Sequence, residues 1–493
     1  MMQIELVAAT PRAVALCLAM PGALHHLPQP LDWRLTGAGL DRRGRTDLAV
    51  TALHDLPPGS SLRVEIAGFA PLDFTTPACA GAVTLTDAAT AQQALDGLPD
   101  GGTLIIPPGR WEIAPLLIPS RRHIWLEKGA ELAAPDSRDG WPILPADQGG
   151  SWEGLPDACY RAILTATGGA GITIAGPGRV DGGGSRGDWW TWPKESRNGA
   201  RRARLLHLID CQDVTVLGPS FTNSPSWTLH PFRSRNLTFA ACAVENPPDS
   251  PNTDALNPES CENVTIAGLR FSTGDDCIAI KAGKRSDAGG AAHLAPTRGI
   301  TIRHCLMQRG HGGVVIGSEM SGGVEGVQIS RCRMEDTDRG LRIKTRRGRG
   351  GFVRGIVMED VTLDGVETVL AINAHYFCDH DGHSAFVQSR TPLPVDAGTP
   401  QIGDIQLKDI RATRVRAAFA ACLGLPEAPV TRVVIRGASV SLDPCAPIAP
   451  LMADGLRAVS GAGILAEFCA IETADIPAAL GTRGALTEKD FAP

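Results

Sequence analysis

Four short motifs in the middle of the chain carry side chains that could together perform acid–base chemistry. The motifs are Asn252-Thr253-Asp254, Gly274-Asp275-Asp276, Gly310-His311-Gly312 and Arg342-Ile343-Lys344. They supply three carboxyl groups, and a protonated carboxyl paired with an ionised one is the usual machinery for breaking a glycosidic bond. Because crowded carboxylates repel one another as anions, one of the three aspartates is expected to retain a proton.

The other two motifs would support this chemistry. The imidazole of His311 could exchange hydrogen bonds with the carboxyl cluster. Arg342 would bind an acidic group of a substrate through its planar fork, and Lys344 would do so as a point charge. Each motif alone is a common turn, loop or edge strand. Their occurrence together, in this order and on a repeating unit, predicts a functional site.

A repeating unit must position the four motifs. From about residue 100, a polar residue or glycine followed by a short β-branched run recurs. The clearest repeats begin at Gly171, Asp213, Asn236, Asn263, Gly299, Gly326, Gly355 and Asp404. Most successive starts are separated by roughly 23 to 36 residues, a spacing typical of solenoids. The pattern predicts a parallel β-helix with coils stacked about 4.8 Å apart, so motifs one repeat apart should lie side by side.

The alternation within each repeat predicts which side chains face the core. The expected inward-facing ladder includes Val214, Leu237, Val264, Ile300 and Val327. Asp275 and Asp276 pose a difficulty, because neighbours in a regular strand face opposite ways. We expect the backbone at Gly274 to turn or bulge so that both carboxyl groups reach the same surface.

Residues 1–85 differ from the rest of the chain. Short apolar runs alternate there with turn signals such as Pro57-Pro58-Gly59, which predicts a small β-sandwich domain. Residues 86–493 are expected to form the β-helix domain. It should open with a short helix over 87–98, capped by Asp87. The apolar run 13–20 is interpreted as a strand rather than a signal-peptide core, because no basic segment precedes it.

Composition excludes several classes of protein. The net charge of −6 and the pI of about 6.1 disfavour a nucleic-acid binder, and no run reaches the roughly 18 apolar residues of a membrane span. The 13 cysteines lack metal-type spacing and are interpreted as buried free thiols. With no clear signal peptide, we expect a cytoplasmic location, with a periplasmic or secreted one as the alternative. No cofactor or metal is predicted, and the oligomeric state stays open.

The four motifs as a set resemble those of the polygalacturonase family of glycoside hydrolases, family 28, over roughly residues 85–470. The resemblance implies a right-handed parallel β-helix that hydrolyses pectin with inversion and without a metal. It further implies that Asp275 is the general acid and that Asp254 and Asp276 position and activate water. His311 would support the protonation state of the acid.

The resemblance also implies a substrate-binding set. Arg342 and Lys344 would hold the substrate carboxylate, and Asn252 would help to order the site. Tyr376 stands on a later coil, where the family often places a tyrosine that contacts substrate; a core or loop role is equally compatible with the sequence. One departure is Ala255, which replaces the usual glycine of the first motif and should require only a local backbone adjustment.

Long loops favour action at chain ends. The segments 341–351 and 374–400 and the Trp-rich run 187–193 exceed plain turns, and loops of this length could close one end of a β-helix groove. The first segment contains Arg346, Arg347 and Arg349, either a local positive patch or a solvated loop. The aromatic residues of the Trp-rich run, Trp189, Trp190 and Trp192, would either stack on sugar rings or anchor the run.

The N-terminal sandwich resembles the fibronectin-III-like module of bacterial exo-acting members of the family. We therefore predict an exo-acting polygalacturonase that removes galacturonate or a short unit from the non-reducing end of pectin oligosaccharides. The alternatives are an endo-polygalacturonase, a hydrolase of decorated pectin such as rhamnogalacturonan or xylogalacturonan, a calcium-dependent pectate lyase, and a β-helix that binds carbohydrate without cleaving it. The motifs 252–254 and 310–312 favour a galacturonate substrate over rhamnogalacturonan.

Overall fold

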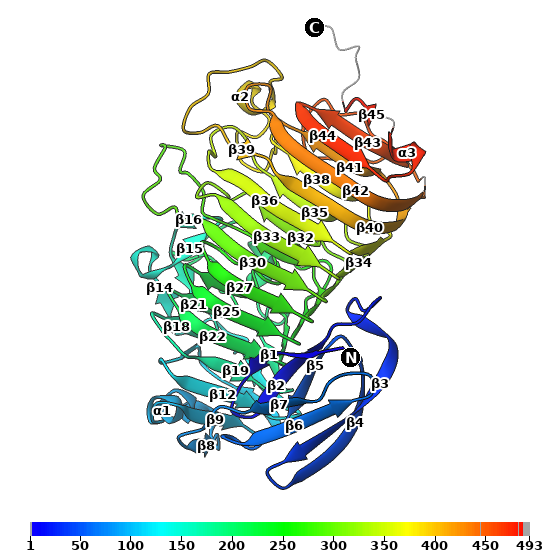
Figure 1. The fold of residues 1–493 in the computed structure, drawn as a ribbon. Coiled ribbons are helices and arrows are strands. Elements are labelled where there is room, and N and C mark those ends of the chain that lie inside the picture. Colours follow the sequence, from blue (N-terminus) through cyan, green and yellow to red (C-terminus); the bar gives the residue numbers. More distant parts are fainter. Residues whose placement is uncertain (1, 444, 482, 487–493) are drawn as a thin grey trace.

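The protein consists of an N-terminal antiparallel sandwich followed by a long stack of parallel coils (Figure 1). The computed structural model describes residues 2–443, 445–481 and 483–486. The predicted all-β fold with a parallel β-helix is confirmed. The antiparallel pairing of the sandwich ends with Thr75, and the strand that begins at Ala82 already pairs in parallel with the coils. The division at residue 85 stays a proposal, and this pairing favours a boundary a few residues earlier.

The sandwich packs a three-stranded sheet against a four-stranded one. The first sheet has the order β1-β2-β5, with β1 (Ile4–Ala9), β2 (Ala13–Leu18) and β5 (Val50–His54). The second has the order β4-β3-β6-β7, with β3 (His26–Gly37), β4 (Leu40–Leu48), β6 (Ser61–Ile66) and β7 (Leu72–Thr75). Leu16, Leu35 and Val64 lie in the core between them. The apolar run 13–20 is thus strand β2 and the residues that follow it.

The longest sheet winds along the whole β-helix and contains 23 strands. Its strands are β8 (Ala82–Thr84), β9 (Gly102–Ile106), β10 (Gly109–Glu112), β12 (Arg122–Leu126), β13 (Ala130–Ala133), β19 (Thr173–Ala175), β20 (Arg179–Asp181), β22 (Gln212–Leu217), β23 (Ser220–Thr222), β25 (Arg235–Ala240), β26 (Ala243–Glu245), β27 (Glu262–Ala267), β28 (Arg270–Ser272), β30 (Thr297–Arg303), β31 (Leu306–Gln308), β33 (Val324–Ser330), β34 (Arg333–Glu335), β36 (Phe352–Glu359), β37 (Thr362–Asp364), β39 (Gln401–Ile402), β40 (Ile405–Val415), β42 (Val430–Leu442) and β44 (Cys469–Ala474).

A second face of the coils, which we call the cleft face, carries two shorter parallel sheets. The earlier one contains β11 (Leu116–Leu117), β18 (Leu164–Thr167), β21 (Leu206–Ile209) and β24 (Leu229–Phe232). The later one contains β29 (Ile278–Ile280), β32 (Val314–Gly317), β35 (Arg339–Lys344), β38 (Thr368–Asn373), β41 (Ala418–Leu423), β43 (Ala462–Glu467) and β45 (Arg483–Gly484). Between them, the coil of Leu256 makes only isolated bridges to Leu229 and Ile278.

The remaining elements are short. The hairpins are β14 (Ile143–Leu144) with β17 (Cys159–Tyr160), and β15 (Ser151–Trp152) with β16 (Leu155–Pro156). The α-helices are α1 (Ala91–Asp96), α2 (Ala385–Gln388) and α3 (Ala478–Gly481), and the 3-10 helices are η1 (Ala88–Thr90), η2 (Ala146–Gln148) and η3 (Trp189–Thr191). The predicted cap is present, because the Asp87 side chain accepts a hydrogen bond from the Ala89 backbone N–H.

The repeat has a conformational cause at its first residue. The backbone at all eight repeat starts is left-handed, with φ between 52° and 71°. Glycine, asparagine and aspartate tolerate this conformation better than other residues, which explains why the repeats begin with only these three types. The β-branched residues that follow pair in register from coil to coil, and Val214, Leu237, Val264, Ile300 and Val327 form the predicted buried ladder.

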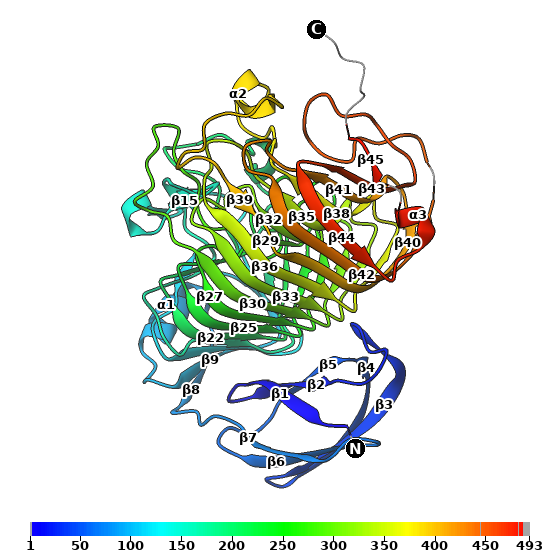
Figure 2. The same cartoon turned by 45° about the horizontal axis from the view of Figure 1, so that its top comes forward.

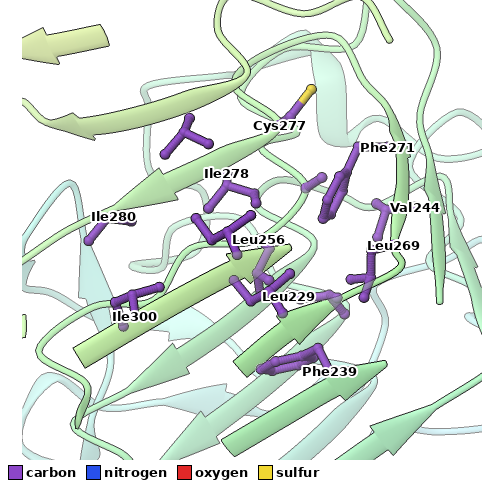
Figure 3. Close-up of a cluster of buried hydrophobic side chains, with 14 of the residues drawn as sticks. Leu229, Phe239, Val244, Leu256, Leu269, Phe271, Cys277, Ile278, Ile280 and Ile300 are labelled. Carbon is purple, nitrogen blue, oxygen red and sulfur yellow. The ribbon is translucent and has the colours of Figure 1, made fainter. Parts of the chain in front are cut away.

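Stacked aliphatic and aromatic side chains fill the interior of the coils (Figure 3). Leu229, Leu256 and Ile278 continue one row beneath the cleft face, and all three are fully buried. Phe239 and Phe271 fill the opposite side of the same coils. At about 25 cal/mol for each square ångström of apolar surface removed from water, such rows supply the main driving force for stacking. They also hold the coils, and thus the site, in a rigid register.

The sandwich docks on the long sheet, away from the cleft face (Figure 2). Cys17 and Val50 pack on Leu217 and Ala267 at the contact. His304 of the coils also contacts the sandwich. Its Nδ1 lies 2.6 Å from the Leu24 carbonyl oxygen, and its own carbonyl oxygen lies 2.9 Å from His25 Nδ1. The sandwich therefore braces the coils without entering the cleft. Among the described residues, no helix is long and apolar enough to cross a membrane.

Candidate active site

The predicted site residues lie where chain segments enter or follow the strands of the cleft face. Ile278, Val314 and Leu341 share one register across β29, β32 and β35. The Gly274-Asp275-Asp276 motif ends two residues before Ile278, and His311 stands three residues before Val314. Because the coils are aligned, motifs that begin 22 to 36 residues apart in the chain become neighbours in space.

All eight residues predicted from the sequence line one cavity of about 440 Å³. They are Asn252, Asp254, Asp275, Asp276, His311, Arg342, Lys344 and Tyr376. The lining contains seven Lys or Arg side chains and seven Asp or Glu side chains. The cavity is therefore balanced in charge although the whole chain is acidic, so an anionic ligand would not meet a net repulsive field.

The two adjacent aspartates lie in a turn before β29 and not within the strand. This resolves the difficulty of neighbours that face opposite ways. The chain bends at Gly274 as predicted, without a left-handed φ at this glycine. A Cβ there would lie 2.4 Å from the Ser250 carbonyl oxygen. Glycine is needed so that this turn can approach the preceding coil closely.

The two glycines around His311 also have separate reasons. Gly310 has a φ of +84°, and a Cβ at this position would lie 2.3 Å from the Asp275 carbonyl oxygen. A Cβ on Gly312 would lie 2.4 Å from a methyl group of Val315 and 3.4 Å from Asp276 Oδ1. A larger residue at Gly310 would clash with the backbone of Asp275, and one at Gly312 would clash with Val315 beside Asp276.

Asp254 is the aspartate whose environment most favours the neutral form. It is 4% exposed, and it accepts a 2.7 Å hydrogen bond from Asn257 Nδ2. The Lys281 ammonium lies 3.7 Å away. Burial and then the negative charge of Asp275 raise the pKa of Asp254 to about 8, against the opposing effect of Lys281. Asp254 therefore holds a proton at neutral pH.

Asp275 and His311 form a pair, with 3.2 Å between Oδ1 and Nδ1. Burial raises the pKa of Asp275, but the hydrogen bond and charge of His311 outweigh it and bring this pKa to about 2. The same hydrogen bond, opposed by burial, raises the pKa of His311 to about 9. The pair thus retains one proton through neutral pH, with the proton on the imidazole side.

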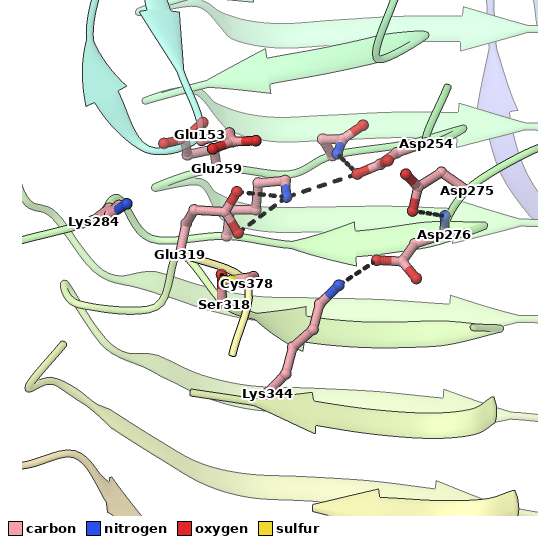
Figure 4. Close-up of polar contacts among 12 residues, drawn as sticks. Glu153, Asp254, Glu259, Asp275, Asp276, Lys284, Ser318, Glu319, Lys344 and Cys378 are labelled. Carbon is pink, nitrogen blue, oxygen red and sulfur yellow. Dashed lines mark hydrogen bonds and ion pairs between the residues drawn. The ribbon is translucent and has the colours of Figure 1, made fainter. Parts of the chain in front are cut away.

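Asp276 is held by cations from the neighbouring coils. Lys344 Nζ donates to Asp276 Oδ2 (Figure 4), with 2.8 Å between the two atoms. Arg342 Nη1 lies 3.7 Å from Asp276 Oδ1. Within the described part of the chain, buried Asp276 Oδ1 has no hydrogen-bond partner. A buried carboxylate oxygen of this kind has a strong tendency to accept a hydrogen bond from a ligand or water.

Arg342 retains donors for a ligand. Its Nη2 lies 3.1 Å from Met452 Sδ, a weak acceptor, and its guanidinium lies 5.5 Å from the centre of the Tyr376 ring. Lys344 Nζ lies at the same distance from that ring. The two cations and the tyrosine therefore form one corner of the cavity, and Tyr376 belongs to it instead of to the core.

Hydrogen bonds from neighbouring coils hold the first motif, residues 252–254, and the alanine that follows it. Asn252 has a left-handed backbone with φ of 54°, and its side-chain oxygen accepts a 2.5 Å hydrogen bond from Arg202 Nη2. Ala255 is fully buried, shows no left-handed φ, and donates its N–H to the Asp276 carbonyl oxygen at 3.0 Å. The replacement of glycine by alanine thus fits a core position.

Sequence reasoning missed several residues of the cavity. Among them is Lys281, which contacts Asp254 and pairs with Glu319. Trp227 lies under Lys281, and Trp152 stacks on Trp227. Lys281 could have been found, because the alternation after Ile278 and Ile280 points it outward, in the same row as Lys344 two coils further on. Glu319 and the two tryptophans come from loops whose paths only the fold reveals.

Of the two alternatives for the Trp-rich run, the structure favours anchoring of the loop. Trp189 and Trp192 are fully buried, where Arg138 lies over both rings, so they anchor their loop and do not offer sugar platforms. Trp190 is also tied to the loop's own surroundings, since its ring N–H donates to the Ser224 carbonyl oxygen.

The arginine cluster is not a free positive patch. Arg346, Arg347 and Arg349 are 6%, 2% and 4% exposed, and each forms ion pairs. Their partners are Asp379, Asp381 and Glu427. The positive charge is neutralised because these arginines fasten the loop 374–400 to the coils, and only Arg349 lines the cavity.

The fold and this site define a glycoside hydrolase of the parallel β-helix class. Residues 154–443 match the family described as Glycosyl hydrolases family 28, and the chain belongs to this family. "Probable polygalacturonase" from Vitis vinifera is 30% identical over 352 residues, which cover 70% of this chain and 68% of that one. "Endo-polygalacturonase" from Pectobacterium parmentieri is 29% identical over 306 residues, 59% of this chain and 72% of that one.

A solved structure extends the similarity of fold to the N-terminal part. The family 28 exopolygalacturonase of Yersinia enterocolitica superposes with a TM-score of 0.65 and 16% identity. The superposition covers 97% of this chain and 99% of that one, so the sandwich and the coils share the fold of that protein. Among the described residues of the present chain, no group of three or more His, Cys, Asp or Glu side chains is arranged to hold a metal ion.

Proposed function

We propose that this protein hydrolyses α-1,4-galacturonosyl linkages of pectin-derived oligosaccharides, acting from the non-reducing end with inversion at the anomeric carbon. The observation that carries the proposal is the shared cavity, in which three aspartates lie beside the cationic corner of Arg342 and Lys344. Carboxyl groups supply the acid and base of glycoside hydrolysis, and the cations supply a place for the carboxylate of a galacturonate residue.

Asp275 is the proposed general acid. Its side chain is 19% exposed, more than the 5% of Asp254 and the 1% of Asp276, so it is the carboxyl most accessible to a glycosidic oxygen. The proton that the pair holds on His311 can return along the 3.2 Å contact to Asp275 and pass to the leaving oxygen. The bond between that oxygen and the anomeric carbon breaks as the proton arrives.

Asp276 is the proposed base for the attacking water. Its unpartnered Oδ1 can accept one water proton while the water oxygen bonds to the anomeric carbon. Asp254, which keeps its proton, would hold the same water by a hydrogen bond. Lys344 stabilises Asp276 as an anion at 2.8 Å before the transfer. Attack on the face opposite the leaving oxygen would invert the anomeric carbon.

Contacts around the cavity support action at chain ends. The hairpin β15–β16 reaches across several coils, where the Gly154 carbonyl oxygen accepts a 2.8 Å hydrogen bond from the Lys284 backbone N–H. The Lys284 side chain in turn pairs with Asp379 at 2.7 Å. The hairpin and the loop 374–400 therefore meet at Lys284. Trp152 of the hairpin stacks on Trp227, with 5.8 Å between the ring centres. We infer that such a rim closes one end of the cavity, so that it would admit a chain end but not a continuing chain.

The test is a product profile on polygalacturonate and on oligogalacturonides of defined length, with and without chelator. We expect saturated monomer or dimer from the first minutes in both conditions, and the β anomer as the first product by proton NMR. A ladder of intermediate lengths would indicate an endo enzyme, and an unsaturated product that chelator abolishes would indicate a lyase. Substrate binding without any product would indicate a binding scaffold or a different pectin linkage.

We further propose a reducing location, the cytoplasm, with imported oligogalacturonides as substrates. All 13 cysteines are free, and nine of them are buried. Free thiols in this number are typical of proteins kept in a reducing compartment. Fractionation of the source cells tests the proposal, and recovery of the protein from the periplasm or the medium would contradict it.

A further inference from the structure

A second polar group faces the cavity across from Asp275, and neither the acid–base roles nor the cationic corner uses it. Glu319 lies there beside Ser318 and Cys378 (Figure 4). Both carboxylate oxygens of Glu319 lie 3.2 Å from Lys281 Nζ. Lys281 is 4% and Glu319 6% exposed, so the pair is largely removed from bulk water while it still lines the cavity.

The pair is held firmly. The backbone N–H of Ala282 donates to the Glu319 carbonyl oxygen at 2.6 Å, which ties the end of β32 to the coil of Lys281. The Lys281 ammonium also lies 4.5 Å from the centre of the Trp227 ring and 3.7 Å from Asp254. The Ala282 hydrogen bond holds the backbone of Glu319 and Lys281 holds its carboxylate, so this group keeps a fixed position relative to Asp254, Asp275 and Asp276.

Stability alone does not account for this arrangement. A buried ion pair seldom contributes more than a pair of apolar side chains of similar size, because both charges must be desolvated. Burial raises the pKa of Glu319, but the charges of Lys281 and then Lys344 outweigh it and lower this pKa to about 2. Glu319 is therefore an ionised carboxylate on the cavity wall. Such a group has about four acceptor positions, more than one ammonium can occupy.

We propose that Glu319, oriented by Lys281, accepts hydrogen bonds from two vicinal ring hydroxyls of the galacturonate bound in the cavity. This inference rests on the proposed function and deepens it, because it names the group that recognises the sugar opposite the general acid. A carboxylate matches two adjacent hydroxyls with its two oxygens. The positive charge of Lys281 offsets the charge of Glu319, so that an anionic sugar is not repelled.

The first experiment measures binding in the inactive Asp275→Asn background by calorimetry with digalacturonate. We expect Glu319→Gln to raise the Kd about 10- to 100-fold, the range for a lost hydrogen bond to a charged group. Glu319→Asp should give a smaller loss. The matched control is Glu259→Gln, because Glu259 is a buried glutamate that pairs in register with Lys281 but bonds to His230 and does not line the cavity. The control should stay within twofold.

The second experiment separates recognition from a loss of structure. The ligand is a digalacturonate whose non-reducing ring lacks the hydroxyl at carbon 3. That hydroxyl belongs to both vicinal pairs of this ring, so its removal breaks either pair. If Glu319 binds one of these pairs, the losses from the deoxy ligand and from Glu319→Gln should not add, and the second change should cost less than threefold. The double variant Lys281→Gln/Glu319→Gln removes both charges and should show the same behaviour if it keeps the wild-type thermal midpoint.

The outcomes distinguish this inference from the proposed function. If the wild-type enzyme cleaves galacturonan but Glu319→Gln leaves the Kd within twofold, or if the two losses are fully additive, the role of Glu319 is overturned and the hydrolase stands. If the wild-type enzyme neither cleaves nor binds galacturonan, the proposed function fails, and this inference fails with it.

Discussion

The two outer faces of the same coils carry the same kinds of side chain under different cover. On the long sheet, Glu325 lies between Arg298 and Arg354 at 2.5 and 2.6 Å, and these arginines are 51% and 61% exposed. On the cleft face, Lys344 and Arg342 reach Asp276 with exposures of 11% and 12%. Strand alternation and coil stacking are common to both faces.

The difference between the faces is the loops. The hairpin β15–β16 and the loop 374–400 cover the cleft face and remove its charges from water, whereas the ladder on the long sheet stays solvated. Exposed ion pairs contribute about 0–1 kcal/mol, but charges in a desolvated cavity shift each other's pKa values and respond to a ligand. A β-helix therefore acquires an active site through the loops laid over one face.

The largest difference between the two faces should be in kcat, when one carboxyl group is removed from each face. Asp275→Asn should lower kcat by about 10²- to 10⁴-fold, the usual range for a lost general acid, with little change in KM. The control Asp364→Asn removes an aspartate that pairs with Arg414 on the solvated face, and it should leave kcat unchanged. Reducing-sugar assays measure both, and a loss below tenfold in Asp275→Asn would assign the acid to another group.

Loss of a buried cation should cost stability that loss of an exposed one does not. Lys281→Met leaves the buried carboxylate of Glu319 without its counter-ion and should lower the free energy of unfolding by about 3–5 kcal/mol. Arg354→Met breaks an exposed pair and should lower it by about 1 kcal/mol or less. Denaturant unfolding of the two variants tests the comparison, and equal losses would remove the distinction between the faces.

The cationic corner should show a geometric requirement that the exposed ladder lacks. Arg342→Lys keeps the charge but loses the planar fork, so we expect KM for oligogalacturonides to rise about tenfold with kcat nearly constant. Arg354→Lys on the other face is the control. If Arg342→Lys acts on kcat alone, Arg342 does not hold the substrate carboxylate in the ground state.

The smallest expected effect is on the pH dependence of stability, and its sign differs between the faces. The pKa of His311 is raised to about 9 by Asp275, so its contribution is complete below about 6.5 and is lost as the pH rises to 9. The pKa of Glu325 is lowered by hydrogen bonds from Arg354 and Arg298, so its contribution is present above 4.5 and is lost on acidification.

Two variants test these signs. His311→Gln should flatten the stability profile between pH 6.5 and 9, and it should move the alkaline limb of kcat/KM to lower pH, because the Asp275 pair would lose the group that stores its proton. Glu325→Gln should flatten the profile below pH 4.5 and leave activity unchanged. Thermal unfolding across pH measures the two stability profiles, and kcat/KM across pH measures the alkaline limb. An unchanged alkaline limb in His311→Gln would contradict the proton shared between His311 and Asp275.

The comparison between the faces also separates what could be predicted from what could not. The repeat starts predicted the coils because Gly, Asn and Asp occupy a left-handed position in each one. The inward ladder followed from the same register. The turn at Gly274 was predicted, but the contact that requires glycine there was not, because a sequence does not reveal that the Ser250 carbonyl oxygen lies against it. The arginines after Lys344 were overestimated as a free patch for a similar reason, since their acidic partners lie 30 to 80 residues away along the chain.

The sequence by itself determined the fold and brought Asp254, Asp275, Asp276 and His311 to neighbouring coils, because their spacing follows a repeat whose geometry is local. Only the tertiary structure decided the environment of these groups. Loops from distant coils exclude water from one face. The proton on Asp254, the ion pair of Lys281 with Glu319 and the stack of Trp152 on Trp227 all depend on these loops. Desolvation and charge interactions act through space, and no local pattern of residues records which loop will cover which strand.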